Sequence, residues 1–312
     1  MYDLLLRHPF MSGEGLTATR AQALLAAMRE VELALAAEQA ALGILPPGTA
    51  DALAGHLGDE VFDLQAMAAE TIKGGNAAIP FVKQAKAALP DELKGHFHKG
   101  ATSQDILDSA LMLLLKPRLE RCMALLADNR QAGCRLMSRH CDTPMVGRTL
   151  MQQALPITFG AKVANWLWGL NLAEKRLGDV AESGLYLQFG GAVGVHSGLG
   201  EHGLSLMDGM ARRLGLEAPL LPWHTDRQPI LALGSAIDAV AAGAEKIALD
   251  ISLLCQSEVG ELSEPAEAGV GESSSMPHKR NPVGCARIRA AAPRLQGRTS
   301  ILSSAASQPL ER

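Results

Sequence analysis

Apolar residues recur along most of the chain at the three- and four-residue spacing of an amphipathic helix. In the segment from Gln228 to Glu264, the apolar positions between residues 237 and 255 follow one another at steps of 3, 1, 3, 3, 1, 3, 3 and 1. This period predicts a long helix, and similar patterns predict two more, from about Thr102 to His140 and from about Met151 to Ser183. Helices of this length span roughly 45–60 Å at 1.5 Å per residue, which favours an elongated bundle of long helices over a compact globule.

The first hundred residues carry shorter helical patterns. Thr19–Leu42 predicts one helix, and proline and glycine pairs punctuate the chain that follows it. Further helical pieces are expected around residues 49–57, 60–73 and 80–89. A last helix is expected to start near Ala292, after a loop that ends at Pro282. The pattern therefore predicts an all-α protein, with a small helical N-terminal domain over residues 1–100 and a central domain of long bundled helices over 101–312.

Composition agrees with this fold and limits the function. Apolar residues make up 47% of the 312 residues and aromatic ones only 4%, so the core suits close-packed helices. The net charge is −4 and no basic stripe is visible, which argues against nucleic-acid binding. No apolar run long enough for a membrane span and no signal-peptide pattern is found. Five scattered cysteines without a C-x-x-C pair are typical of free thiols in a reducing cytosol, so we expect a cytoplasmic protein.

Three polar loops lie at the predicted ends of the long helices, at residues 98–105, 145–153 and 271–282. Functional side chains are often carried by such loops on a rigid scaffold. Between Ser273 and Asn281 the third loop places three hydroxyls, an imidazole, an ammonium, a guanidinium and an amide. A serine-rich stretch flanked by glycine is more often a mobile linker, but this density of donors suits an anion with several carboxylates.

The first loop has a structural explanation and a functional one. Thr102 or Ser103 can cap the following helix, with Asp105 favourable in its first turn. A helix N-terminus also binds anions, so capping and substrate binding are compatible. His96 and His98 lie two residues apart, but nothing nearby completes a ligand set, so we expect no metal site.

Two other segments have ordinary structural explanations. Residues 221–227 are a polar segment that precedes a long helix. In this segment Trp223 can act as a hydrophobic staple, and Thr225 or Asp226 can act as the N-cap. The glycines within residues 190–194 match neither the dinucleotide-binding nor the P-loop motif, and no βαβ pattern surrounds them, so a nucleotide-binding fold is rejected.

The run from Ser273 to Pro282 closely resembles the signature of the fumarase/aspartase superfamily. Gly100–Asp105 and Gly147–Pro156 are similar to the other two regions that this superfamily shares. Within it, the chain most resembles the bacterial 3-carboxy-cis,cis-muconate cycloisomerases, through these regions and through residues 187–192 and 221–225. The resemblance extends over nearly the whole chain.

The resemblance implies an all-α homotetramer around a long helical bundle, with each active site built from three regions that belong to three subunits. The implied reaction closes 3-carboxy-cis,cis-muconate, a small tricarboxylate, to 4-carboxymuconolactone in the protocatechuate branch of the β-ketoadipate pathway. It requires no metal or organic cofactor. Chains of this family usually continue into a small C-terminal helical domain, which we expect to be missing from this sequence.

The resemblance also implies residue roles. Ser273 matches the catalytic serine of a mobile loop, while Lys279 and Asn281 match residues that bind a substrate carboxylate and anchor the loop. Because the protein carries −4 overall, a trianion must be attracted by local positive charge. The expected catalytic residues are Ser273 and Lys279. The expected substrate-binding residues are His98, Thr102, Ser103, Arg148, Gln153, His224, Arg227, Ser274 and Asn281.

Two departures from the superfamily pattern affect the predicted function. Many of its lyases have histidine where this chain has Leu150, and that histidine protonates a poor leaving group. A carboxylate leaving group, with a pKa of about 4, needs no acid, so Leu150 favours the cycloisomerase. The alternatives are another lyase, such as an adenylosuccinate lyase-like enzyme, and a catalytically inactive structural paralogue. Glu272 stands where the superfamily usually has glycine, and a carboxylate is unexpected beside a site for a trianion.

Overall fold

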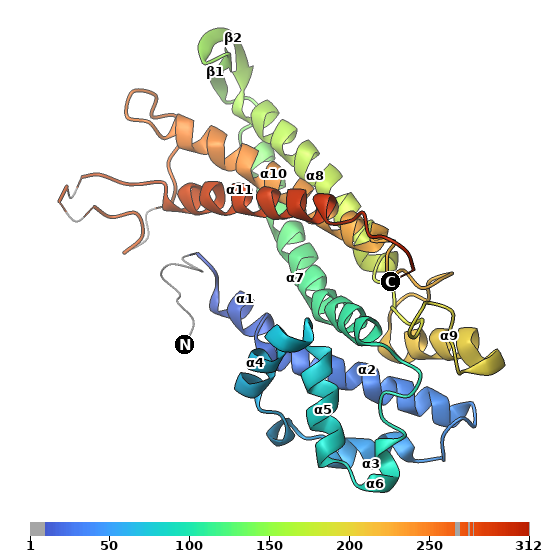
Figure 1. Cartoon of the computed structure of the whole chain (residues 1–312). Helices are drawn as coiled ribbons and strands as arrows, with labels where there is room; N and C mark the ends of the chain where they lie inside the picture. Colours follow the sequence, from blue (N-terminus) through green and yellow to red (C-terminus); the bar gives the residue numbers. More distant parts are fainter. Residues whose placement is uncertain (1–9, 266–268, 274, 277, 312) are drawn as a thin grey trace. The chain divides into compact units, whose positions relative to one another are not determined.

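The structure is a computed structural model that describes residues 10–265, 269–273, 275–276 and 278–311. The predicted all-α class is confirmed, since helices account for nearly all of the regular structure in these residues and a single two-stranded sheet for the rest (Figure 1). Contacts divide the chain into two compact units. The first comprises Met1–Glu120, Ala181–Pro229 and Ala306–Arg312, and the second comprises Arg121–Val180 and Ile230–Ala305. The expected domain boundary near residue 100 stays a prediction.

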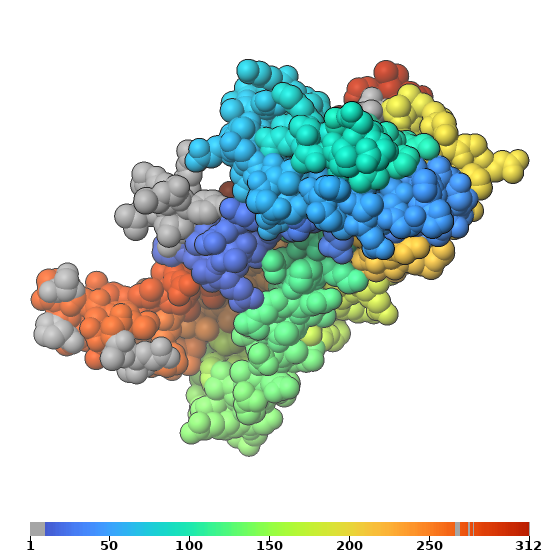
Figure 2. Space-filling model, turned by 90° about the horizontal axis from the view of Figure 1, so that it is seen from below, coloured from blue at the N-terminus to red at the C-terminus, as the bar shows by residue number. Residues whose placement is uncertain are grey.

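The first unit is built on α2 (Ala21–Ala41), which packs against α3 (Thr49–His56) and α9 (Gly203–Leu214). Its other helices are α1 (Gly13–Ala18), α4 (Leu64–Gly74), α5 (Ala78–Ala88), α6 (Asp91–Lys94) and the first part of α7 (Ser103–Arg139), with short 3-10 turns at Asp59–Val61 and Gly200–His202. The side chains of α2 to α5, blue to cyan in Figure 2, form one continuous packed surface. In this unit Phe81 is fully buried, and the centre of its ring lies 5.2 Å from that of Phe62 and 6.0 Å from that of Phe97.

The second unit contains the later part of α7, α8 (Phe159–Ser183), α10 (Gln228–Leu254) and α11 (Val283–Ser304). Polar contacts join neighbouring helices. The Trp166 indole N–H donates to Asp250 at 2.7 Å between α8 and α10, and Gln296 donates to Glu245 at 3.2 Å between α11 and α10. The expected helix from Thr102 to His140 is confirmed as α7, with Pro117 inside it.

The expected helical start near Met151 is wrong. Strands β1 (Pro144–Thr149) and β2 (Gln152–Thr158) form an antiparallel hairpin there, at the end of α8 in Figure 1, and α8 begins only at Phe159. Leu150 and Met151 both adopt left-handed backbone angles, with φ of 47° and 66°, as the two central residues of a tight hairpin turn do. Pro156 also disfavours helical angles at the residue before it.

Two other helix boundaries differ from the prediction. α10 ends at Leu254 rather than near Glu264, and the chain folds back after it, so that the Glu261 and Leu262 N–H groups both donate to the Leu254 carbonyl oxygen, at 3.0 and 3.2 Å. α11 begins at Val283 rather than near Ala292. The Glu264 carboxylate accepts hydrogen bonds from the N–H groups of Gly284 and Cys285 at 3.0 and 2.7 Å, and so caps the first turn of α11 from a distant part of the sequence.

Candidate functional site

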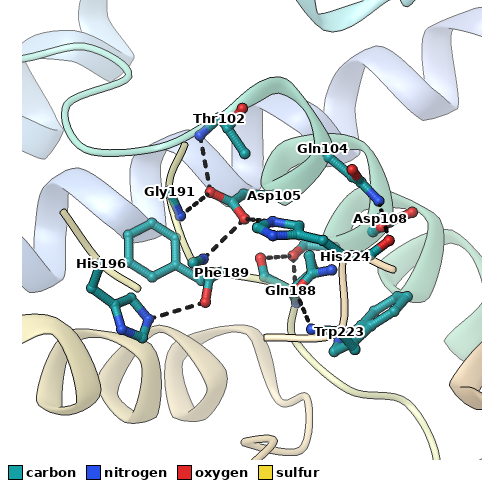
Figure 3. Close-up of polar contacts among 12 residues, drawn as sticks. Thr102, Gln104, Asp105, Asp108, Gln188, Phe189, Gly191, His196, Trp223 and His224 are labelled. Atoms are coloured by element: carbon teal, nitrogen blue, oxygen red, sulfur yellow. Dashed lines mark hydrogen bonds and ion pairs between the residues drawn. The ribbon is translucent and has the colours of Figure 1, made fainter. Parts of the chain in front are cut away.

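The start of α7 is organised around a buried carboxylate, that of Asp105, which is 1% exposed. One of its oxygens accepts hydrogen bonds from the Thr102 and Gly191 N–H groups, each at 2.9 Å. The other accepts from the Gly190 N–H at 3.0 Å and lies 2.7 Å from His224 Nε2 (Figure 3). A single carboxylate therefore joins the helix start, the glycine-rich segment and the segment before α10.

Local sequence explains this arrangement. Thr102 and Asp105 stand three residues apart, as the partners of a capping box do, with the acidic side chain returning to the N–H of the cap. Gly191 has a φ of 71°, and a Cβ there would lie 2.9 Å from the Gly100 carbonyl oxygen. Glycine is therefore required where this segment passes the loop before α7.

Two of the expected substrate-binding side chains are paired with carboxylates of α7. The His224 side chain is 1% exposed, and its Nδ1 is buried without a partner among the described residues. The Arg227 guanidinium donates to both oxygens of Asp108, at 2.7 and 2.9 Å, and lies 4.9 Å from the centre of the Trp223 ring. Both side chains thus hold the residues around the start of α7 in place.

The loop before α7 carries two more of the expected residues. His98 has a φ of 61°, and its Nδ1 lies 2.5 Å from Oε1 of Glu32 on α2. The Ser103 hydroxyl lies 3.5 Å from the side-chain nitrogen of Asn76. These residues and the cluster around Asp105 all belong to the first unit.

In the second unit, Arg148 lies in β1 rather than in a loop, and it pairs with Gln153 of β2 across the hairpin. Its guanidinium donates to both carboxylate oxygens of Glu261, at 2.9 and 2.7 Å. These hydrogen bonds raise the pKa of Arg148 and hold the pKa of Glu261 below its ordinary value. Gly147 sits in an irregularity of the ladder, where a Cβ would lie 2.5 Å from the Leu155 carbonyl oxygen.

Two cavities flank the hairpin. Arg148 lines one of about 470 Å³ together with Lys162 and Asp250. A second, of about 860 Å³, lies at the hairpin base and is lined mainly by apolar side chains, with His140 and Glu261 among the polar ones.

The third polar loop is closed at its base by backbone pairing. The backbone and side-chain N–H groups of Asn281 both donate to the Gly271 carbonyl oxygen, at 2.9 and 3.1 Å. Gly271 has a φ of 68°, and a Cβ there would collide with the Asn281 carbonyl. The next pair inward, Glu272 and Arg280, forms an isolated antiparallel bridge.

Within the loop closed by these pairs, the Ser273 hydroxyl accepts hydrogen bonds from the N–H groups of Ser275 and Met276, at 3.4 and 3.2 Å. Lys279 is exposed, and its N–H donates to the Met276 carbonyl at 3.0 Å. Ser274 lies outside the described residues.

The structure thus groups the expected residues within each unit. The first unit holds His98, Thr102, Ser103, His224 and Arg227, and the second holds Arg148, Gln153, Ser273, Lys279 and Asn281. Sequence reasoning missed the carboxylates that pair with the cations, namely those of Glu32, Asp108 and Glu261. The spacing of Thr102 and Asp105 was a signal that could have identified Asp105 as more than a favourable first-turn charge.

The described residues contain neither a cluster of metal ligands nor a helix that could span a membrane. No group of three or more histidine, cysteine, aspartate or glutamate side chains in them is arranged to hold a metal ion. None of their helices combines the length and apolar character that a membrane span requires.

Comparison with known proteins gives consistent matches. A family described as lyase matches residues 11–297. The 3-carboxy-cis,cis-muconate cycloisomerase of Pseudomonas aeruginosa is 41% identical over 292 residues, which are 91% of this chain and 63% of that relative. The nitrosuccinate lyase of Streptomyces davaonensis is 40% identical over 299 residues, with 90% of this chain and 61% of that relative covered. This chain therefore spans less than two thirds of the length of either curated relative.

Solved structures agree. The crystal structure of the 3-carboxy-cis,cis-muconate lactonizing enzyme from Pseudomonas putida matches with a TM-score of 0.91 and 37% identity, over 97% of this chain and 68% of that chain.

Proposed function

Because the chain belongs to the lyase family that matches residues 11–297, we propose that it acts as a cycloisomerase that closes 3-carboxy-cis,cis-muconate to 4-carboxymuconolactone. The similarity to the Pseudomonas aeruginosa and Pseudomonas putida enzymes supports the substrate class. The observation that favours a weakly basic leaving group, such as a carboxylate, is Leu150, which stands at the tip of the hairpin where many lyases of the superfamily have histidine.

The chemistry explains why a leucine is acceptable at this position. In lactone formation, a carboxylate oxygen of the substrate bonds to one carbon of a double bond, and a proton is added to the carbon α to another carboxylate. In reverse, the α-proton is removed and a carboxylate is expelled. A carboxylate is a weak base that leaves without being protonated. Leu150 is 96% exposed and has no proton to give, which agrees with this requirement.

The proposed roles follow the chemistry of each side chain. Lys279 stabilises the negative charge that develops beside a substrate carboxylate, and Ser273 carries the proton. Asn281 anchors the loop through its two hydrogen bonds to Gly271. The N-terminus of α7, with Thr102 and Ser103, receives a further carboxylate.

The remaining residues complete the proposed site. The substrate is bound by Arg148, Gln153, Ser274 and His98. His224 and Arg227 position the start of α7 through their contacts with Asp105 and Asp108.

We propose a cytoplasmic homotetramer in which active sites are shared between subunits. Exposed apolar side chains in the second unit support association, among them Trp168 at 64% and Ile301 at 67% exposure. Size-exclusion chromatography with light scattering measures this directly, and a monomer of 32.9 kDa at micromolar concentration would contradict it.

The deciding experiment is to add purified protein to 3-carboxy-cis,cis-muconate, follow the loss of muconate absorbance, and identify the lactone by NMR. We expect turnover by the wild type and its near-complete loss in Ser273→Ala and Lys279→Ala, with unchanged circular dichroism. No turnover, under conditions in which the Pseudomonas aeruginosa relative is active, would reject the cycloisomerase and leave an inactive paralogue as the better description.

A second candidate is elimination from nitrosuccinate, which the 40% identical Streptomyces relative supports. Nitrite is also a weak base, so the argument from Leu150 applies equally to it. Colorimetric detection of nitrite separates this reaction from lactone formation. Adenylosuccinate, whose amine leaving group needs an acid, is expected to remain unchanged.

A further inference from the structure

Lys162, in the first turn of α8, is a cation that makes no hydrogen bond within the described part of the chain. The carboxylate within ion-pair distance of it is that of Asp250, whose Oδ2 lies 4.0 Å from Lys162 Nζ, beyond hydrogen-bond distance. That oxygen already accepts from the Trp166 indole N–H at 2.7 Å and from Lys246 Nζ at 2.5 Å. The Lys162 side chain is only 22% exposed, so water solvates it only in part.

The position of Lys162 does not favour the fold. The first turn of α8 contains no acidic residue, and the helix dipole disfavours a cation near a helix N-terminus. The N–H groups of residues 159–161 are already hydrogen-bonded, at 2.8 to 3.1 Å. The helix start itself is therefore not an open anion site, and an anion bound here would be held by the Lys162 side chain.

Lys162 lines the cavity of about 470 Å³ beside the hairpin, called here the hairpin cavity. Small-molecule sites typically have volumes of about 300–1,000 Å³ and an apolar lining with a few polar groups. Side chains from the hairpin tip, from the end of α10 and from the turn after it form the apolar wall, namely Leu150, Met151, Leu253, Leu254 and Val259. This lining suits a ligand that combines an apolar carbon skeleton with a negative charge.

The charged side chains around the hairpin cavity leave one positive charge without a carboxylate of its own. Arg148 donates through both terminal nitrogens to the carboxylate of Glu261. Lys246 is paired with Asp250, and Lys162 is the third cation of the group. The hydrogen bond from Arg148 is the main cause that holds the pKa of Glu261 below its ordinary value, and the charge of Lys162 adds to this effect. The field of Lys162 therefore reaches the carboxylate on the hairpin side of the cavity.

We infer that Lys162 binds a carboxylate of the substrate, whose carbon chain lies against the apolar wall of the hairpin cavity. The ligand class, an organic carboxylate, follows from the charge and the lining of the cavity, whereas its identity as the substrate rests on the proposed function. Leu150 connects the two, because it lines the cavity and stands at the position that favours a weakly basic leaving group.

The first test measures occupancy at Lys162 directly. Reductive methylation of lysines in the whole protein, followed by mass spectrometry of its peptides, is compared with and without tricarballylate, a tricarboxylate that does not react. At a concentration ten times its Kd, tricarballylate is expected to slow labelling of Lys162 by about tenfold and to leave labelling of Lys246 unchanged. Equal labelling of Lys162 with and without the tricarboxylate would overturn the inference.

The second test measures tricarballylate binding by calorimetry. Lys162→Met keeps an unbranched side chain without the charge, and it is expected to weaken binding by about tenfold to a hundredfold, the range for one hydrogen bond to a charged group. The matched control is Lys246→Met, the same substitution at the other lysine beside Asp250, whose side chain is 56% exposed. This control is expected to bind like the wild type. Because the helix dipole disfavours a cation at residue 162, Lys162→Met is expected to unfold at no lower temperature than the wild type.

The outcomes separate this inference from the proposed function. Equal weakening by the two variants would show that only overall charge matters, and it would overturn the inference, as would a wild type that does not bind tricarballylate. If the wild type converts 3-carboxy-cis,cis-muconate and Lys162→Met does so with an unchanged KM, the inference is wrong and the proposed function stands. If the wild type converts none but tricarballylate protects Lys162, the carboxylate site stands and its assignment to this substrate is wrong.

Discussion

Replacing Asp105 by alanine removes the acceptor that joins three segments at the start of α7. Its carboxylate accepts from the N–H groups of Thr102, Gly190 and Gly191 and contacts His224 Nε2, with distances between 2.7 and 3.0 Å. Because the carboxylate is 1% exposed, solvent cannot replace it without opening the structure. All four donors would lose their partner together.

The expected loss of stability follows from these contacts. A buried donor left without a partner costs about 1–3 kcal/mol, so four such donors lower the free energy of unfolding by about 4 kcal/mol even at the low end. A typical domain has about 5–15 kcal/mol in total, so Asp105→Ala is expected to be at or near the limit of folding. Asp105→Asn keeps one acceptor oxygen and turns an NH₂ group towards the remaining donors, so we expect an intermediate loss.

Urea unfolding followed by circular dichroism measures the global effect, and hydrogen exchange of peptides containing Gly190 and Gly191 reports on the site. The matched control is Asp63→Ala. Asp63 caps α4 through the N–H groups of Gln65 and Ala66, at 2.9 and 3.0 Å, but is exposed to solvent, so about 1 kcal/mol is expected. If Asp105→Ala costs no more than Asp63→Ala, the argument from burial is refuted.

Three further predictions concern the second unit. Burial, and secondarily Glu264, raises the pKa of the Cys285 thiol to about 12, so native protein at pH 8 should be alkylated there far more slowly than urea-unfolded protein; equal rates by mass spectrometry would contradict this. The hydrogen bond from Arg148 holds the pKa of Glu261 below its ordinary 4.5, so the pair stabilises the fold above that pH and loses its effect as the pH falls through the lower folded value. Glu261→Gln should therefore reduce the thermal midpoint slightly at pH 7 and by progressively less as the pH falls below 4.5, and a deficit that grows on acidification would show the sign to be wrong. Replacing Leu150 and Met151 together by Asn and Gly, which accept their left-handed angles, should stabilise the hairpin by about 1 kcal/mol, and faster hydrogen exchange in both strands would argue against it.

The long helices could be predicted because the apolar periodicity continues over many turns. Both ends of α7 lie within one residue of their expected positions. The hairpin could not, because Leu150 and Met151 lack the glycine or asparagine that usually marks such a turn. The start of α11 was missed for a different reason. Its cap is the carboxylate of Glu264, whose bonds to Gly284 and Cys285 cross 20 and 21 residues of sequence, and no local pattern reports such a contact.

The candidate residues were located by resemblance, but their electrostatic partners were not. The carboxylates that pair with His98, Arg148 and Arg227 lie 66, 113 and 119 residues away in the sequence. Physical chemistry requires a buried or half-buried cation to have a partner. It does not say which of 33 acidic residues the fold brings there.

These pairings change how a trianion would be attracted to a protein of net charge −4. Glu272, unexpected in the sequence, accepts a hydrogen bond from the Gly269 N–H at 3.1 Å and lies 3.7 Å from Arg280, so it holds the base of the loop and offsets the charge of Arg280. Arg148 is compensated by its own carboxylate, as Arg227 is. Lys279 is exposed and has no ion pair among the described residues. The sequence suggested a diffuse set of cations, but the structure concentrates the available positive charge of this loop on Lys279, the residue to which the proposed chemistry assigns the developing negative charge.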